Sequence, residues 1–472
     1  MTVVRCGVCF LPMRLLATPL SSYWTFLRSP GNTRFIAFGF VLTLASNFGQ
    51  TFFIALSGGH IREAFSLTDG QFGLIYSLAT LASGFSIIWL GTLIDRLDVR
   101  SMTLMVCCGM IIAALLMAAS PAILVLGLAL FLLRLNGQGL LGHISTTCMA
   151  RYFNSGRGKA ISLASLGYPA GEAILPILFV AIIALIGWRM SWLIVAGALV
   201  VTLIPMVLWL LIGHGDRHRA HVAALHDAEA KAASQNEFGA AVGKARGHQW
   251  TRPEVLRDSR FYMILPAALS PAFIVTGLFF HQVHMVEEQG WRLDWFAACF
   301  AAYAAAQLAS ALGSGEVIDR IGARQILPLY LLPLIGGLLL LATLNHAVLT
   351  PLLLMAMLGL TAGMVGPLVN STWAELYGVK HLGSIRALST ACMVFSTSLS
   401  PFLMGTLIDA QVSIGTIATG FLVIATAASV SAFIALRHAD GDDGRCGPAA
   451  PERIPAVRLL DDVEDPPERA SG

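Results

Sequence analysis

Twelve long stretches of predominantly apolar residues divide this chain of 472 residues. A helix needs roughly 20 apolar residues to cross the hydrocarbon core of a bilayer. Only 12% of the residues are charged, against about 25% in soluble domains. The pattern therefore predicts an all-α polytopic membrane protein rather than a water-soluble fold. The expected spans are 34–57, 70–94, 101–119, 121–149, 158–187, 190–213, 259–286, 294–318, 322–344, 347–373, 382–406 and 412–437.

Basic residues in the short loops predict the orientation, because cytoplasmic loops are enriched in Lys and Arg. One set of loops holds nine of them and the opposite set holds three, so we expect the first set, both termini and the polar linker to be cytoplasmic. The richer set is Arg96, Arg100, Arg151, Arg157, Lys159, Arg320, Arg324, Lys380 and Arg386, and the poorer set is Arg62, Arg189 and Arg292. The predicted segments are an N-terminal segment (1–33), an N-terminal six-helix bundle (34–213), a linker (214–258), a C-terminal six-helix bundle (259–437) and a disordered tail (438–472).

An internal duplication relates the two expected bundles. The loop after the second span has Gly91, Asp95, Arg96 and Arg100, and the loop after the eighth repeats this pattern 224 residues later. The matching residues of the second copy are Gly315, Asp319, Arg320 and Arg324. Two similar halves related by an axis along the membrane normal are a known transporter architecture.

The duplicated loop resembles the signature loop of the major facilitator superfamily, with Asp98 in place of the usual glycine in the first copy and Gly322 in the second. Residues Arg134 to Gly139 resemble a second motif of that superfamily, and the resemblance covers about residues 34–437. The region from Arg151 to Gly171 and the Gly187-Trp188-Arg189 triplet look like the monocarboxylate and oxalate/formate branch. The resemblance implies twelve helices in two pseudo-symmetric bundles, and gating contacts made by the eight loop residues. The alternative is that the arginines only enforce topology.

Ionisable residues inside the spans are functional candidates, because charge is costly in lipid. Arg134 in span four and Glu172 in span five lie at similar depth. They either neutralise each other and fix the helix packing or serve substrate and proton coupling. Glu172 is the better proton carrier, because burial favours the neutral form of a carboxyl group.

Further polar side chains extend the candidate substrate site to other spans. Histidine changes its charge near neutral pH, so His281 and His284 in span seven either contact ligand or protons or are ordinary interfacial residues. In span four, either the face of Arg134 and Gln138 or the opposite face with His143 lines the cavity. The remaining candidates are Asn47, Gln50, Tyr303, Gln307 and Asn370.

These features predict a secondary active transporter that moves a small solute, such as an organic monocarboxylate, across the plasma membrane by alternating access. Relatives of that branch hold the substrate carboxylate with a basic residue in span eight or eleven. Here span eight has no Lys or Arg between Leu293 and Arg320, and span eleven has only Arg386, near its cytoplasmic start, so a carboxylate would need Arg134 or the histidines. Drug or metabolite efflux and a non-transporting sensor on the same scaffold remain as alternatives.

No catalytic constellation, metal site or nucleotide-binding motif is present, so we expect no enzyme activity and no cofactor. The net charge of +3 does not suggest a nucleic-acid partner. The expected partners are the small-molecule substrate, a coupling proton and the lipid bilayer, with the protein as a monomer in a bacterial inner membrane.

Overall fold

The computed structural model is all-helical over its described residues, which are residue 26 and residues 32–91, 97–153, 156–215, 249–344, 347–378 and 380–443. Ten helices are long and apolar enough to cross a membrane. Two further spans are shorter or interrupted: α2–α3 at the start of the chain and α19–α20 in the second half. The prediction of a twelve-helix membrane protein is therefore confirmed.

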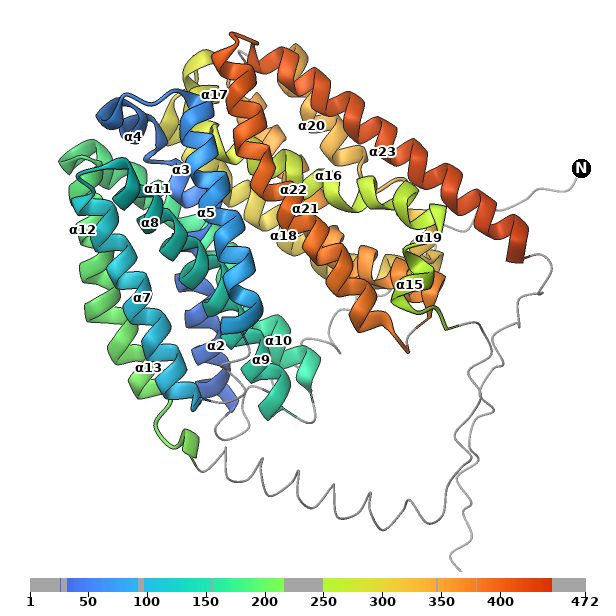
Figure 1. The fold of residues 1–472 in the computed structure, drawn as a ribbon, viewed down its shortest axis with the longest axis horizontal. Helices are drawn as coiled ribbons and strands as arrows, with labels where there is room; N and C mark the ends of the chain where they lie inside the picture. Colours follow the sequence, from blue (N-terminus) through green and yellow to red (C-terminus); the bar gives the residue numbers. More distant parts are fainter. Residues whose placement is uncertain are drawn as a thin grey trace, which may run out of the picture.

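The first half forms one bundle, drawn in blue to green in Figure 1. Its elements are α2 (Asn32–Ser46), η1 (Asn47–Gly49), α3 (Thr51–Ala55), α4 (Gly58–Phe65), α5 (Asp69–Leu90), α7 (Val99–Ala119), α8 (Ile123–Leu133), η2 (Arg134–Leu141), α9 (Gly142–Tyr152), α10 (Arg157–Ser165), α11 (Gly167–Ile186), α12 (Trp188–Ala198), η3 (Leu199–Leu203) and α13 (Ile204–Leu210).

The second half forms the yellow-to-red bundle beside it (Figure 1). Its elements are α15 (Arg252–Val255), α16 (Ser259–Phe280), α17 (Gln282–Glu288), α18 (Leu293–Ile321), α19 (Ala323–Ile326), α20 (Leu332–Thr343), α21 (Thr350–Tyr377), α22 (Leu382–Asp409) and α23 (Ile414–Asp443). The two bundles meet mainly along two helix pairs, α5 with α22 and α11 with α18.

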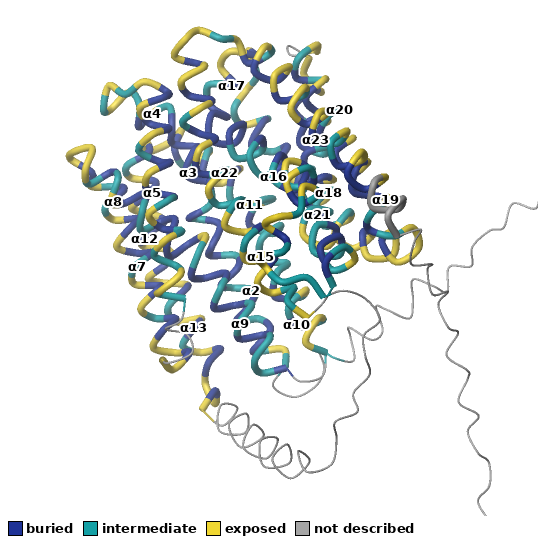
Figure 2. Tube along the Cα trace, turned by 45° about the vertical axis from the view of Figure 1, so that its right-hand side comes forward, coloured by how far each residue is buried: buried dark blue, intermediate teal, exposed yellow. Residues whose placement is uncertain are grey.

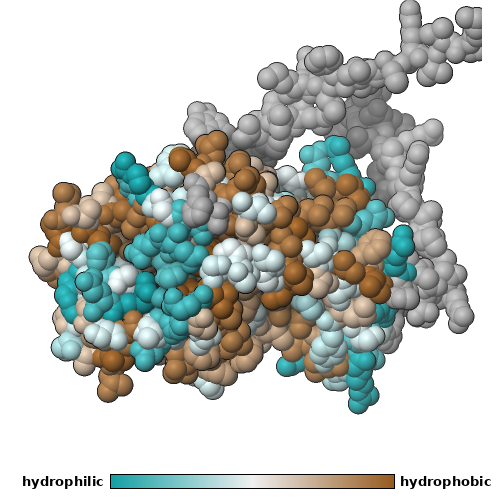
Figure 3. Space-filling view, turned by 90° about the horizontal axis from the view of Figure 1, so that it is seen from above, coloured by the Kyte–Doolittle hydropathy of each residue, from teal (hydrophilic) through white to brown (hydrophobic). Residues whose placement is uncertain are grey.

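Burial follows the expectation for a protein whose solvent is lipid. Large apolar side chains such as Leu124, Leu185 and Val201 are exposed, while the buried residues lie within and between the bundles (Figure 2). In water, such extensive exposed apolar surface would cause aggregation, whereas in a bilayer it faces the acyl chains. Viewed from above, hydrophilic side chains gather on one end of the molecule and are flanked by hydrophobic ones (Figure 3).

Among the described residues, four expected spans are divided by at least one non-helical residue. The first is interrupted over η1 and Gln50, which has extended backbone angles (φ −78°, ψ 152°). The fifth consists of α10 and α11, which meet at Leu166. The seventh ends as α16 at Phe280 and continues as α17 from Gln282. The ninth contains α19 and α20, separated by a turn. The first and seventh spans occupy equivalent places in the two halves, so the duplicated architecture has a break in both.

The break in the first span has a local cause. The side-chain amide of Asn47 donates to the carbonyl oxygens of Thr43 and Leu44, so the side chain competes with the helix ladder. At Gly49 the chain crosses the fourth span so closely that a Cβ on Gly137 would lie 2.6 Å from the Cα of Gly49. The fourth span is itself wound as a π-helix over η2 at this crossing. Wide turns of this kind occur often at functional sites.

The crossing predicts a stability effect. Gly137→Ala should destabilise the protein by about 1–3 kcal/mol, the usual cost of overpacking a tight contact, because its Cβ would collide with backbone atoms of Gly49. Thermal unfolding of the purified protein in detergent would measure the loss. Gly197→Ala on α12 is the matched control, because a Cβ there meets nothing within 4 Å. Equal melting temperatures for the two variants would contradict the close crossing.

Candidate functional site

One pair of helix ends brings the two bundles into backbone contact. A Cβ on Gly73 of α5 would lie 2.5 Å from the carbonyl oxygen of Pro401 in α22, and one on Gly405 would lie 2.6 Å from the carbonyl oxygen of Asp69. Only glycine permits this approach, since any side chain would have to displace backbone. We call this end, which holds α4, α17 and the start of α5, the closed end. The opposite end, where α13 leads toward residues 216–248, is the linker end.

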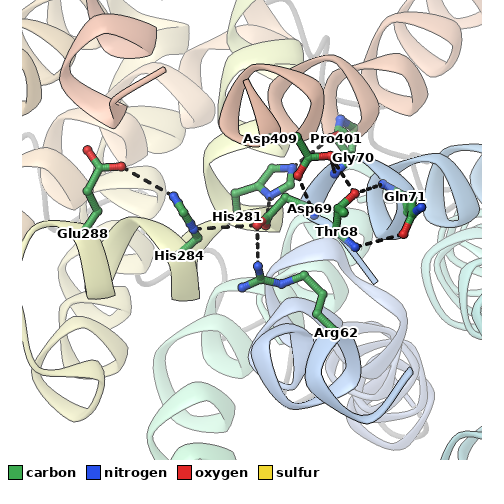
Figure 4. A network of polar contacts seen from close by, with 10 residues as sticks. All are labelled: Arg62, Thr68, Asp69, Gly70, Gln71, His281, His284, Glu288, Pro401 and Asp409. Carbon is green, nitrogen blue, oxygen red and sulfur yellow. Dashed lines mark hydrogen bonds and ion pairs between the residues drawn. The ribbon is translucent and has the colours of Figure 1, made fainter. Parts of the chain in front are cut away.

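Asp69 lies at the centre of a polar network at the closed end (Figure 4). Arg62 of the same bundle forms an ion pair with its Oδ2 atom. From the other bundle, Nδ1 of His281 lies 3.1 Å from its Oδ1 atom, and Nδ1 of His284 lies 3.7 Å from Oδ2. The Nε2 atom of His284 also lies 3.5 Å from Oε2 of Glu288. The carboxylate of Asp69 thus joins the two halves electrostatically.

Asp409, the last residue of α22, caps the start of α5 from the opposite bundle. Its carboxylate accepts hydrogen bonds from the backbone N–H groups of Asp69 and Gly70, both at 3.0 Å, and from the hydroxyl of Thr68 at 2.6 Å. Helix N-termini have unpaired N–H groups and favour negative charge. Thr68 and Gln71 also form a capping box within the helix itself. The start of α5 is therefore satisfied partly by its own residues and partly by the other half.

An aromatic layer lies next to the network and between the bundles. Phe280 stacks on Phe72 with ring centroids 4.9 Å apart and contacts Tyr76 at 4.5 Å. Phe52 contacts Phe300 of α18 at 5.3 Å. The side-chain amide of Gln282, fully buried, donates to the backbone carbonyl of Phe52 across the same boundary. The network and this layer together pack the two bundles against each other at the closed end.

Arg134 lies directly behind the aromatic layer and is only 4% exposed. Its Nη1 atom donates to the carbonyl oxygen of Gly49 and to the hydroxyl of Thr51, both at 3.3 Å, and its guanidinium lies over the ring of Tyr76. None of the described acidic side chains forms an ion pair with it, and its Nε–H has no partner. Arg134 thus holds the broken first span and is a buried cation without a counter-charge in the part of the chain that the structure describes.

Glu172 lies elsewhere on the boundary between the bundles. It is close enough to Tyr303 of α18 and to Tyr168 for its charge to act on both. Its Oε2 atom is buried without a hydrogen-bond partner, and no described basic side chain pairs with it. Arg134 and Glu172 therefore do not neutralise each other in this conformation, although the sequence allowed for it.

The other candidates of the first half divide by environment. Asn47 is fully buried and donates to the carbonyl oxygen of Gly167, so it joins the first and fifth spans. Gln50 is partly exposed at the break, and Gln138 is exposed on η2. His143 lies near the end of α5, where a Cβ on Gly91 would be 3.6 Å from its Nε2 atom. The first half thus supplies Gln50 and Gln138 as its accessible amides.

In the second half, Tyr303 contacts the ring of Phe279 at 5.3 Å, and the backbone of Gln307 packs against Gly363. The side-chain oxygen of Gln307 is buried without a hydrogen-bond partner. Asn370 donates to the carbonyl of Gly366 one helical turn earlier. Tyr303 and Gln307 belong to α18 and Asn370 to α21.

The eight expected gating residues make no contact between halves that the structure describes. Asp95 and Arg96 lie outside the described residues. Arg100 is in the first turn of α7, which Asp98 caps with φ −60°, so this loop does not need the glycine that its second copy has at Gly322 (φ 96°).

In the second copy, Arg324 and the backbone N–H of Ala323 bind Glu375 of the same half. Arg320 pairs with Glu316 on its own helix, while Gly315 and Asp319 are exposed. These contacts are local to the second half.

Comparison with known proteins gives a family and a similar solved structure. The sequence model of the Major Facilitator Superfamily matches residues 35–401 and again residues 275–457. This chain belongs to the major facilitator superfamily. No curated protein matches it in sequence. In structure it is similar to the bacterial homologue of the human lysosomal transporter Spinster, solved in an inward-facing and occupied conformation, with a TM-score of 0.55 and 14% identity over 87% of this chain and 94% of that one.

The cap from Asp409 generates a prediction about the closed end of this superfamily member. Asp409→Ala should weaken closure by about 0.5–2 kcal/mol, the usual cost of losing a helix cap. Spin labels at Leu124 and Val348, exposed residues on opposite bundles at this end, would report the change as a larger population of long distances. The control is Asp294→Ala, which removes an exposed carboxylate paired only with Arg292 and its own helix start. An unchanged distance distribution in Asp409→Ala would contradict the capping role.

Proposed function

We propose that this membrane transporter is a secondary active transporter that works by alternating access and that the conformation described is open toward the linker end. The observation that carries this proposal is the unequal packing of α5 against α22. At the closed end the two helices touch through glycines and the Asp409 cap. Toward the linker end they diverge, and a cavity of about 670 Å³ lies between them.

The cavity between α5 and α22 supports an opening on the side of the linker end. Its lining is mainly apolar. The lining residues are Leu81, Gly84, Phe85, Ile87 and Ile88 of α5, Arg252 of α15, and Ala387, Leu388, Thr390, Ala391, Val394 and Phe395 of α22. In the opposite state of an alternating-access cycle these faces would approach each other while the closed end separates. With the linker end in the cytoplasm, as the loop charges predict, this state is inward-open.

The duplicated loops fit this proposal as gates of the other state. In the conformation described, Arg324 is held by Glu375 within its own half, and no described loop residue bridges the halves. We propose that the Asp-Arg loops engage when the linker end closes.

An organic anion is the substrate class that the central residues favour. Arg134 is a buried guanidinium without an acidic partner among the described residues, and such a group gains most from binding a carboxylate. Glu172 is a carboxyl without a basic partner among the described residues. Its protonated form is uncharged and can therefore carry a proton along the boundary between the halves. Arg134 and Glu172 together would couple the movement of the anion to the movement of a proton. The apolar lining of the cavity favours a second candidate, the efflux of apolar compounds, for which Arg134 would not be needed.

Arg134→Gln should lower the uptake of organic monocarboxylates into proteoliposomes about tenfold or more, because a charge-assisted hydrogen bond contributes about 1.5–3 kcal/mol. Arg134→Lys should retain part of the activity, since it keeps the charge but not the planar donor geometry. Arg437→Gln, at the exposed end of α23, is the control. Unchanged anion uptake in Arg134→Gln, or transport of apolar dyes only, would contradict the organic-anion assignment.

Glu172→Gln should abolish accumulation driven by a pH gradient but leave substrate exchange between the two sides of the vesicle. The neutral amide keeps the size of the side chain and cannot release a proton. Counterflow and gradient-driven uptake, measured in the same vesicles, separate the two effects. Glu316→Gln, an exposed carboxylate on α18, should change neither. Gradient-driven accumulation by Glu172→Gln would exclude Glu172 as the coupling group.

A further inference from the structure

The ring of His281 is held between two hydrogen-bond acceptors. Its Nε2 atom lies 2.8 Å from the carbonyl oxygen of Pro401, and its Nδ1 atom lies 3.1 Å from Oδ1 of Asp69. A carbonyl oxygen only accepts hydrogen bonds, and an ionised carboxylate also only accepts. Both ring nitrogens therefore face groups that require a donor.

A neutral imidazole has only one N–H group, so it can satisfy only one of these two acceptors. The observed geometry needs one additional proton, either on His281 as imidazolium or on Asp69 as a carboxylic acid. His281 is 3% exposed, so water cannot readily replace the missing donor. The His281–Asp69 pair as it lies here holds one proton more than a neutral histidine and a free carboxylate would.

The surrounding charges favour binding of this proton. The charged groups that face the pair are Arg62 from α4, Glu288 from α17 and Asp409 from α22, with His284 from α17 as a further titratable neighbour (Figure 4). With Asp69 included, these are three carboxylates and one guanidinium when both histidines are neutral. Glu63 of α4 and Glu287 of α17 line the pocket beside Arg62 and add negative charge there. The neighbouring α3 (Thr51–Ala55) contributes no titratable side chain. The nearby Arg292–Asp294 pair is neutral as a unit and exposed.

The two members of the pair belong to different halves. Asp69 begins α5 in the first bundle, whereas His281 and Pro401 both belong to the second. When the closed end opens, Asp69 moves away from the imidazole ring of His281, and the ring loses its second hydrogen-bond acceptor. The requirement for the additional proton exists only in the closed arrangement.

We propose that His281 and Asp69 form a proton-binding site that is complete only when the closed end is shut, and that a proton taken from the solution on that side drives this end to close. This inference rests on the proposed alternating-access transport and adds a site distinct from Glu172. A proton bound in one conformation and not in the other shifts the balance between the two by linkage. Lower pH on this side therefore favours the closed end.

The test measures the closed end directly and needs no substrate. Spin labels at Leu124 and Val348 are introduced into a variant without native cysteines and read in nanodiscs between pH 5.5 and 8.5. The ratio of open to closed distances should rise with pH, by up to about tenfold per pH unit for a single linked proton. A ratio that does not change with pH would overturn the proposal.

Two variants separate the proton site from a merely structural contact. In Asp69→Asn, the amide N–H₂ can donate to Nδ1 of a neutral His281 while Nε2–H donates to Pro401. This variant should therefore still close but lose the pH dependence. His281→Gln, which cannot titrate, should also lose it. His60 is an exposed histidine at the same end, so His60→Gln should show the native dependence of the open-to-closed ratio on pH. A native slope in Asp69→Asn or His281→Gln would overturn the assignment.

Transport assays distinguish a failure of this inference from a failure of the proposed function. A pH-dependent closed end in a protein that moves no tested anion would leave the proton site standing and contradict transport. Anion flux through a protein whose closed end ignores pH would support transport and remove the proton site. Circular dichroism and size-exclusion profiles of each variant show whether it is folded before its slope is compared.

Discussion

Asp69 carries its charge in the first turn of α5, where Arg62 of its own half and His281 of the other half converge on it. The backbone on both sides of this carboxylate is pressed against α22, and Asp409 occupies the helix N-terminus. Charge pairing across a boundary is worth most where water is excluded, and Asp69 and His281 are the buried members of the network, beside the aromatic layer. The closure of this end depends on these few groups meeting in one place.

The remaining architecture follows from the need to satisfy polar groups inside the membrane. In lipid every backbone N–H and C=O must find a partner within the protein. The break in the first span would leave such groups unpaired. Arg134 donates a hydrogen bond to one of them, the carbonyl oxygen of Gly49. The π-helix at the crossing places this guanidinium against the break. Under the proposed function, this cation, which has a structural task and no acidic partner among the described residues, would anchor a transiently bound anion.

The sequence predicted the number of helices, the duplication and the family, because these depend on hydropathy and on a loop pattern that is local in the chain. It also singled out Arg134, Glu172, His281 and His284, since ionisable groups in apolar stretches stand out individually. It missed Asp69 and Asp409, which lie at the ends of spans, where a carboxylate is ordinarily a solvated cap. The Thr68–Gln71 capping box is local to the start of α5, whereas Asp69 and Asp409 are 340 residues apart in the chain. Their role depends on which ends of the two halves meet, and that is a property of the tertiary arrangement.

The cap that Asp409 provides to α5 has a consequence for the solvent. In the proposed alternating-access cycle, the N–H groups of Asp69 and Gly70 and the carboxylate of Asp409 all lose their partners at once when the two halves part at this end. Each must then be hydrated, so opening takes up water that the shut interface does not contain. The conformational equilibrium of this end is thereby sensitive to water activity, and osmolytes excluded from the protein surface would favour the shut form without binding to it.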